Sequence, residues 1–442
     1  MKRFIETIRN IFRIEELKKR ILYTLGILLI YRLGSFVVLP GINPEALAGS
    51  GLQDQTASGI LGLLDIFSGG AFSNASIFAL GIMPYISASI VIQLLGIAVP
   101  YFRKLQMEGE SGRRKINQWT RYLTIGILLL QAPAYLVNLH ATVPASAFVL
   151  ADSPVLFTMV ATTILIAGTM FCMWLGEKIT DKGIGNGISL IIMVGIIARL
   201  PHSFLAEVNA RFTTAGGGFV MLIVELVLLF LIFAATIALV QAVRKIPVQY
   251  AKRIMGNRQY GGVRQYIPLK INAAGVMPII FAQAIMMLPA LFGSFEATQG
   301  IAATFANIYG FWYNFVFFIL VVLFTYFYTA ITINTNQMSD DIKRNGGFIP
   351  GIKPGKHTAS YLDQVMTRIT LPGSIFLGFI AILPVFAHLI GVDSQFAMFY
   401  GGTSLLILVG VILDTLQQIE SQLLLRHYDG MMKGGKLKGR NA

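Results

Sequence analysis

Cysteine, charged residues and metal-binding motifs are all scarce in this sequence. Cys172 is the one cysteine among 442 residues, so an intrachain disulfide is excluded. The five histidines are isolated from one another, and none belongs to an HExxH or similar ligand pattern. Charged residues make up 13% of the chain, against about 25% in a typical soluble domain. We therefore predict no metal, no cofactor and no redox or other enzymatic chemistry.

The chain is instead rich in apolar residues, which make up 55% of it. This composition is typical of a polytopic membrane protein. Ten apolar segments are long enough to cross a bilayer as helices, since about 20 residues at about 1.5 Å each cover a hydrocarbon core of about 30 Å. They are Ile21–Val38, Ile77–Ile97, Tyr122–Leu139, Leu156–Leu175, Ile188–Leu205, Phe219–Val240, Ala273–Phe292, Phe311–Ile333, Leu371–Leu389 and Phe399–Leu416.

The positive charges fall on one side of these segments. If the segments alternate in direction, 32 of the 35 Lys and Arg residues lie on the side of the two termini. Arg199 and Arg211 lie on the opposite side, and Arg32 lies within the first segment. By the positive-inside rule both termini are cytoplasmic. Residues 1–20 are basic and amphipathic and lack an apolar core with a cleavage site, so we expect no removable signal peptide.

One predicted span, Ile77–Ile97, is unusual for a membrane helix. Its polar and helix-breaking residues need a protein neighbour or a water-filled cavity. They are Gly81, Pro84, Ser87, Ser89 and Gln93. We therefore expect a helix that is broken at Pro84 and faces other protein or a pore. From the residues alone, a Pro-kinked helix buried in a bundle explains the pattern as well.

The stretch Gly59–Ser73, which reads GILGLLDIFSGGAFS, is apolar but too short and too rich in glycine to cross the bilayer. It lies on the outer side between the first two predicted spans. A re-entrant helix and a helix that lies in the membrane interface fit this pattern equally well.

Two long loops lie on the cytoplasmic side. Within Gln241–Lys270, alternating stretches that contain Tyr and Val flank turn residues, which predicts a hairpin. The second loop, Asn334–Thr370, includes KRNGGFIPGIKPGKHT, whose Gly and Pro content favours an ordered turn over a helix. The positive charge of both loops follows from membrane orientation alone, but their length favours a docking surface.

The ten predicted spans divide into two halves of five. Because five is an odd number, a duplicated second half has the opposite orientation in the membrane. Inverted halves place a transport path at their interface in channels and carriers alike. An ion-coupled carrier more often has a buried carboxylate near a broken helix, and none lies near Pro84. The two charges within spans, Arg32 and Glu225, have no obvious partner in the sequence. For both we expect snorkelling or a contact between helices.

Five long motifs carry a resemblance to a known family. They are FSGGAFSNASIFALGIMPYISASIVIQLL, EGESGRRKINQWTRY, GTMFCMWLGEKITDKGIGNGIS, VMTRITLPG and YGGTSLLILVGVILD, in this order. Together they resemble the SecY family, the central subunits of the bacterial Sec protein-conducting channel. The resemblance runs from the first span to the C-terminal tail.

The resemblance implies an all-α membrane protein in which ten transmembrane helices form two inverted five-helix halves around a central pore. We expect an N-terminal segment 1–20, an N-terminal half 21–205, a C-terminal half 206–420 and a basic tail 421–442. Segment 59–73 matches the re-entrant plug helix, with Leu61, Leu64, Phe67, Gly69 and Gly70 in it. The pore ring matches six isoleucines, which are Ile82, Ile86, Ile188, Ile192, Ile280 and Ile407. A narrow ring of branched apolar side chains seals a pore because it offers water and ions no hydrogen bond.

The resemblance also implies a lateral gate, between the second and third spans of one half and the seventh and eighth spans of the other. We add three polar candidates for hydrogen bonds across this gate, Gln93, Thr120 and Gln283. The two loops match the docking surface for the ribosome and the motor ATPase SecA, with Arg244, Lys245, Lys252, Arg253 and Lys353 as candidates. Lys353 stands where we expect the family's arginine, so the charge is kept and the bidentate fork is lost.

The implied function is a channel that conducts unfolded secretory polypeptides across the bacterial plasma membrane and releases apolar segments into membrane lipid. The implied partners are the subunits SecE and SecG, SecA, the ribosome and polypeptides with signal sequences. An ion-coupled secondary transporter of small solutes is the alternative.

Overall fold

The structure of this 442-residue protein is a computed structural model. It describes residues 14–45, 60–144, 147–148, 154–213, 218–250, 253–255, 258–260, 264–286, 300, 304–305 and 307–433. The chain forms two compact units. Unit 1 comprises Met1–Leu205 and Gly410–Ala442, and unit 2 comprises Ala206–Val409. Each unit is described by itself.

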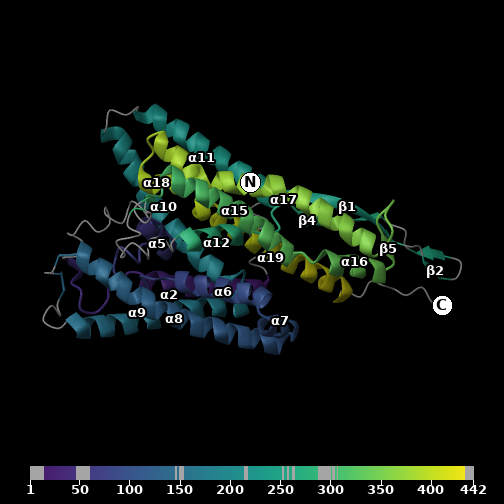
Figure 1. The fold of residues 1–442 in the computed structure, drawn as a ribbon, viewed down its shortest axis with the longest axis horizontal. Coiled ribbons are helices and arrows are strands. Elements are labelled where there is room, and N and C mark those ends of the chain that lie inside the picture. Colours follow the sequence, from purple (N-terminus) through teal and green to yellow (C-terminus); the bar gives the residue numbers. More distant parts are fainter. Residues whose placement is uncertain are drawn as a thin grey trace. The chain divides into compact units, whose positions relative to one another are not determined.

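Unit 1 is a bundle of long apolar helices that also contains two short helices, α5 (Ile60–Ser68) and α7 (Pro100–Met107), as Figure 1 shows. Its other helices are α2 (Glu15–Gly34), α6 (Met83–Ala98), α8 (Glu110–Thr142), α9 (Pro154–Lys182) and the greater part of α10 (Gly187–Thr213). The later part of α19 (Gly402–Lys433) also belongs to it. Helix α8 packs against α6, α7 and α9. A buried cluster that includes Phe72, Leu136 and Leu165 joins α8 and α9 to the loop before α6.

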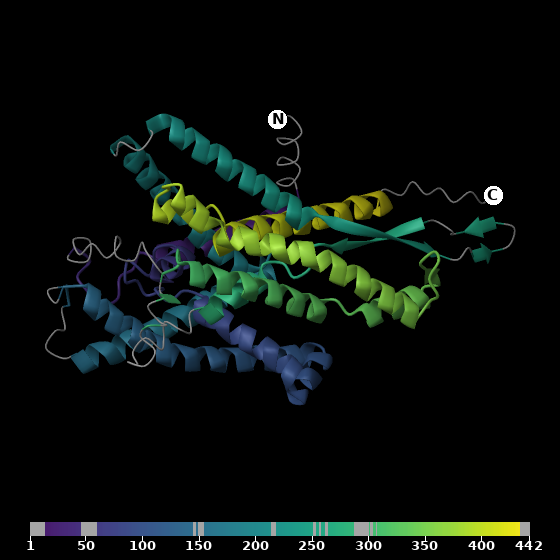
Figure 2. The ribbon, with the colours of Figure 1, turned by 45° about the horizontal axis from the view of Figure 1, so that its top comes forward.

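Unit 2 combines apolar helices with a small sheet. Its helices are the end of α10, α11 (Gly218–Gln241), α12 (Met277–Met286), α15 (Phe311–Thr332), α16 (Thr335–Arg344), α17 (Lys356–Leu389), α18 (Ser394–Ala397) and the start of α19. Helix α15 packs against both α12 and α17. Figure 2 shows the longer strands of this unit beside its helices, and a buried cluster that includes Val248, Ile342 and Leu362 joins them to α16 and α17.

The strands confirm the hairpin predicted within Gln241–Lys270. Strand β1 (Val243–Tyr250) pairs antiparallel with β4 (Arg264–Lys270), and β5 (Gly347–Phe348) joins the other edge of β1. A second antiparallel pair consists of β2 (Arg253–Met255) and β3 (Arg258–Tyr260). Residues 345–355 form the turn predicted in the second loop, and α16 and α17 flank it.

A helix covers part of each of the ten predicted spans. Among the described helices, seven are long and apolar enough to cross a membrane, or eight if α6 and α7, which are bent by 99°, form one broken span. Helix α11 exposes large apolar side chains such as Val220, Phe230 and Leu231. Such a surface is favourable in lipid and unfavourable in water. The chain is therefore a multi-pass membrane protein, as predicted, and the predicted span Ala273–Phe292 runs beyond the described residues.

The second predicted span begins as a helix later than expected. Helix α6 starts at Met83, and residues 77–82 form turns. Gly81 has a φ of +54°, a left-handed conformation that interrupts regular structure. Pro84 lies in the first turn of α6, where its missing N–H costs no hydrogen bond. The expected break of a helix at Pro84 is therefore wrong, because residues 77–82 are not helical and Pro84 lies in the first turn of α6.

Candidate functional site

Helix α5 is the helical part of segment 59–73, which matches the plug, and the turn after it is also described. With nine residues it is about 14 Å long, too short to cross a bilayer. The chain then turns through Gly69, with a φ of +66°, and Gly70, with a φ of +90°. Glycine alone adopts these angles without strain. Phe67, Gly69 and Gly70 are buried and Leu64 is half-buried, while the side chain of Leu61 lies outside the described residues.

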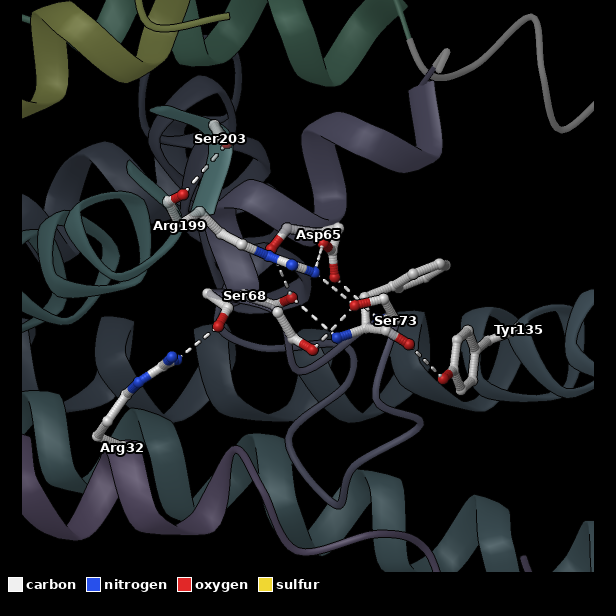
Figure 3. Close-up of polar contacts among 10 residues, drawn as sticks. Arg32, Asp65, Ser68, Ser73, Tyr135, Arg199 and Ser203 are labelled. Atoms are coloured by element: carbon white, nitrogen blue, oxygen red, sulfur yellow. Dashed lines mark hydrogen bonds and ion pairs between the residues drawn. The ribbon is translucent and has the colours of Figure 1, made fainter. Parts of the chain in front are cut away.

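Arg199 of α10 holds this turn against α5, as Figure 3 shows. Its guanidinium forms an ion pair with Asp65 of α5 and donates a hydrogen bond to the hydroxyl of Ser73. The Asp65 carboxylate also accepts a hydrogen bond from the backbone N–H of Ser73 at 2.8 Å. The side chains of Arg199 and Asp65 are 15% and 9% exposed, so water competes little for either group. One arginine thus ties α10 to α5 and to the turn that follows it.

Two side chains of α2 hold the same turn. Arg32 donates a hydrogen bond to the carbonyl oxygen of Gly69, and the Tyr31 hydroxyl donates one to the carbonyl oxygen of Ser68 at 3.3 Å. The Arg32 guanidinium also lies 4.7 Å from the centre of the Phe36 ring. The sequence shows no partner for Arg32, and the structure provides a backbone carbonyl in place of snorkelling.

Helix α8 adds a further contact to the turn. The Tyr135 hydroxyl donates a hydrogen bond to the carbonyl oxygen of Phe72 at 3.0 Å, and the two rings meet edge to face at 4.8 Å. We use the name plug seat, after the resemblance stated above, for the residues whose side chains tie α5 and its turn to α2, α8 and α10, which are Tyr31, Arg32, Asp65, Ser73, Tyr135 and Arg199.

Gly195 of α10 allows the turn to approach closely. A Cβ atom at this position would lie 2.8 Å from the carbonyl oxygen of Phe67 and 3.2 Å from the backbone nitrogen of Gly69. Those contacts are too short for a close-packed interior, so a larger residue would displace the turn. Close approach and a few polar bonds hold a segment that is not continuous with any span. Hydrogen bonds in membrane proteins contribute about 0.6 to 2 kcal/mol each, which is compatible with reversible release.

The six ring candidates lie in both units. In unit 1, Ile82 precedes α6, Ile86 lies in its first turn, and Ile188 and Ile192 lie in the first turns of α10. In unit 2, Ile280 lies in α12 and Ile407 in α19. Ile82, Ile192 and Ile407 are buried, and the other three are half-buried. A ring that joins the two units stays a prediction.

The three gate candidates also lie in both units. Gln93 of α6 donates a hydrogen bond to the Ser89 hydroxyl at 3.4 Å, and Thr120 of α8 donates one to the carbonyl oxygen of Ile116 at 2.9 Å. Both bonds stay within one helix. Gln283 of α12 is buried. Hydrogen bonds across a lateral gate stay a prediction.

The docking candidates lie in unit 2 at the strands and the turn before α17. Arg244 and Lys245 are exposed on β1, and Lys353 is exposed in the turn. The side chain of Arg253 on β2 is not among those described, and Lys252 lies outside the described residues. In the part of the chain that the structure describes, no group of three or more His, Cys, Asp or Glu side chains is placed to hold a metal ion.

The sequence analysis missed most of the plug seat. Asp65, Ser73, Tyr135 and Arg199 were not among its candidates. Two signals pointed to the ion pair: Asp65 is the one charged residue in Gly59–Ser73, and Arg199 is one of two Lys or Arg residues predicted to lie on the outer side. Opposite charges isolated on the same side of a membrane are natural partners, since each needs neutralisation in a medium of low dielectric.

Comparison with known proteins assigns the chain to a family. The SecY family model matches residues 76–416. The chain belongs to the SecY family. The protein translocase subunit SecY of Halalkalibacterium halodurans is 44% identical over 436 residues, with 97% of this chain and 99% of the relative covered. The SecY subunit of Streptomyces scabiei is 43% identical over 433 residues, with 96% and 98% covered.

Solved structures share the fold of this SecY-family chain. A structure of a protein-conducting channel has a TM-score of 0.62 at 20% identity, with 95% of both chains covered. Sec61 in a canine ribosome-channel complex from the endoplasmic reticulum has a TM-score of 0.58 at 18% identity, also with 95% of both chains covered. At these identities the structural likeness establishes the fold, and family membership rests on the sequence matches.

Proposed function

We propose that this chain is the channel-forming subunit of a bacterial protein translocase. In this role it conducts unfolded polypeptides across the plasma membrane and releases apolar segments sideways into lipid. The observation that carries the proposal is similarity over nearly the whole chain to relatives named protein translocase subunit SecY. A similar fold occurs in a protein-conducting channel, which supports the same conclusion.

The plug seat supports this reading physically. A channel for polypeptides must be closed at rest and open without rebuilding its walls. Helix α5 is short and separate from the spans, and side-chain contacts hold it. Such a segment can leave its place while the long helices keep their packing. The carrier alternative has no comparable support from the comparisons, and we do not propose it.

The partners follow from the same proposal. One neighbour of similar fold is part of a ribosome-channel complex, so channels of this kind work within larger assemblies. We extend this to SecE and SecG as companion subunits and to SecA and the ribosome as cytoplasmic partners. The exposed cations Arg244, Lys245 and Lys353 support a docking role, because they can pair with the anionic groups of RNA or of a protein.

Photo-crosslinking tests the pore. A photoreactive amino acid is placed at Ile86, Ile188 or Ile407 in turn, and a secretory chain is stalled halfway through export. We expect crosslinks to the stalled chain from all three positions. Phe230, which is 72% exposed on the apolar helix α11, is the matched control and should give none. Absence of crosslinks from the isoleucines in membranes where export runs would reject the pore.

A charge reversal tests the docking surface. The variant Arg244→Glu with Lys353→Glu should bind ribosomes or SecA at least tenfold more weakly at moderate salt, since two attractive contacts become repulsive. The control is Lys115→Glu, an exposed cation of unit 1. Binding is measured with membranes that contain each variant complex. Wild-type affinity of the double variant would place the docking surface elsewhere.

A further inference from the structure

A second arginine of α10 contacts two buried carboxylates in unit 2. The Nε atom of Arg211 lies 2.7 Å from Oε1 of Glu207, and Arg211 Nη2 pairs with Oε1 of Glu225 on α11. Nη2 also donates a hydrogen bond to the carbonyl oxygen of Gly391 at 2.8 Å. The Glu207–Arg211–Glu225 cluster thus ties the end of α10 to α11 and to the turn after α17.

The cluster contains two carboxyl groups and one guanidinium group. The side chains of Arg211, Glu207 and Glu225 are 10%, 0% and 3% exposed. With both carboxylates ionised, one guanidinium would leave a net charge of −1 in a nearly dry site. Burial of an uncompensated charge is strongly unfavourable, and a carboxyl group in this position takes up a proton instead.

The hydrogen bonds show which oxygen lacks a partner. Both oxygens of Glu207 are occupied, because Oε1 pairs with Arg211 and Oε2 accepts the backbone N–H of Asp393 at 2.6 Å. Glu225 also pairs with Arg211 through Oε1, but its Oε2 is buried and has no hydrogen-bond partner among the described residues. The Tyr400 hydroxyl, which interacts electrostatically with both carboxylates, is likewise buried without a hydrogen-bond partner.

No described neighbour supplies the missing positive charge. The charged groups that act on Glu225 are Glu207 and Arg211, both from α10. From the turn after α17, Asp393 adds another carboxylate, which caps α18 by accepting the backbone N–H of Gln395 at 3.1 Å. From the segment before α19, Tyr400 adds a neutral hydroxyl.

We infer that the Glu207–Arg211–Glu225 cluster is a proton-binding site in which Glu225 carries the proton on Oε2. The bound proton makes the cluster neutral, since Glu207 and Arg211 form the remaining ion pair.

Infrared spectroscopy of the purified complex in lipid bilayers tests the assignment. A protonated carboxyl group has a carbonyl band that an ionised carboxylate lacks. We expect this band at neutral pH in the wild type, its loss in Glu225→Gln, and its retention in the control Glu420→Gln, an exposed glutamate of α19. Glutamine mimics the neutral form of Glu225, so the variant should unfold at the wild-type temperature and with a weaker dependence on pH.

The other outcomes overturn the inference. A band that disappears only in Glu207→Gln places the proton on Glu207. Absence of the band in the wild type, together with lower stability of Glu225→Gln, means that both carboxylates are ionised. A band that depends on the sodium concentration at fixed pH means that a metal cation competes for the site. If Glu225→Gln fails to assemble, Glu225→Asp decides, because it keeps a carboxyl group at this position and must change the frequency of the band. An unchanged band in Glu225→Asp assigns the proton to another group.

Discussion

Arg199 and Arg211 lie on the same helix, α10, and have different surroundings. Arg199 pairs with one carboxylate on a short helix, and the two side chains are 15% and 9% exposed. Arg211 pairs with two carboxylates that are 0% and 3% exposed, on helices long enough to span a membrane. Arg199 therefore holds a helix of nine residues that is too short to be a span, and Arg211 holds helices that are long enough to be spans.

The difference shows that the role of a buried arginine in a membrane protein depends on its burial and also on the helix that carries its carboxylate partner. If α5 leaves its seat, Asp65 can become hydrated, because α5 is too short to be held across the membrane. Glu207 and Glu225 have no such route, so the loss of their arginine strands charge in an apolar interior. The Arg199–Asp65 pair is therefore suited to a segment that is released reversibly. The contacts of Arg211 with Glu207 and Glu225 are suited to helices that stay packed together.

The largest effect is expected when Arg211 is replaced by Met. Glu207 and Glu225 would remain buried with no cation, which costs about 3 to 5 kcal/mol. Thermal unfolding of the purified complex measures the loss. The matched control is Arg199→Met, the same change on the same helix, for which we expect a clearly smaller loss. Equal losses in the two variants would contradict the comparison.

A smaller effect on stability, with a clear effect on function, is expected for Asp65→Asn. The change removes the charge that Arg199 holds, and hydrogen bonds to charged groups contribute about 1.5 to 3 kcal/mol. The loss applies to the position of α5 and leaves the packing of the long helices intact. We expect higher resting ion conductance of reconstituted complexes with near-normal thermal unfolding. The exposed Asp363 of α17 provides the control Asp363→Asn, which should conduct like the wild type.

The smallest effect on the fold is expected for Gly195→Ala, which tests the seat without a change of charge. The added Cβ would lie 2.8 Å from the Phe67 oxygen, so the turn after α5 must shift at a cost of about 1 kcal/mol. The readout is the labelling rate of a cysteine placed at Ser68, since native Cys172 is buried. Gly26→Ala is the matched control, because a Cβ at Gly26 meets nothing within 4 Å. Equal labelling in both variants would argue against a close seat.

Much of the secondary structure could be predicted from the sequence, because each helix or hairpin depends on residues that are close to one another along the chain. Apolar length predicts the spans, and alternation around turn residues predicts the β1 and β4 hairpin. The start of α6 could not be predicted in the same way. Length and apolarity extend the span back to Ile77, but the left-handed backbone of Gly81 and the position of Pro84 begin the helix at Met83.

The candidate site was predictable only in part. The glycines at 69 and 70 and the shortness of the segment predict a turn that returns, and the structure has that turn. The side chains that hold it come from α2, α8 and α10. No sequence motif or repeat relates these helices to α5. Three of the hydrogen bonds that hold the turn are accepted by backbone carbonyl oxygens, which every residue has, so the sequence does not mark them.

The sequence by itself determined that this chain is a multi-pass membrane protein of the SecY family, because composition, apolar length and motif order are all readable along the chain. Only the tertiary structure decided which charges meet. Asp65 and Arg199 are 134 positions apart, and Glu207, Arg211 and Glu225 come together with Gly391 of a distant turn. In a medium of low dielectric every charge needs a partner, and helix packing alone determines which partner is within reach.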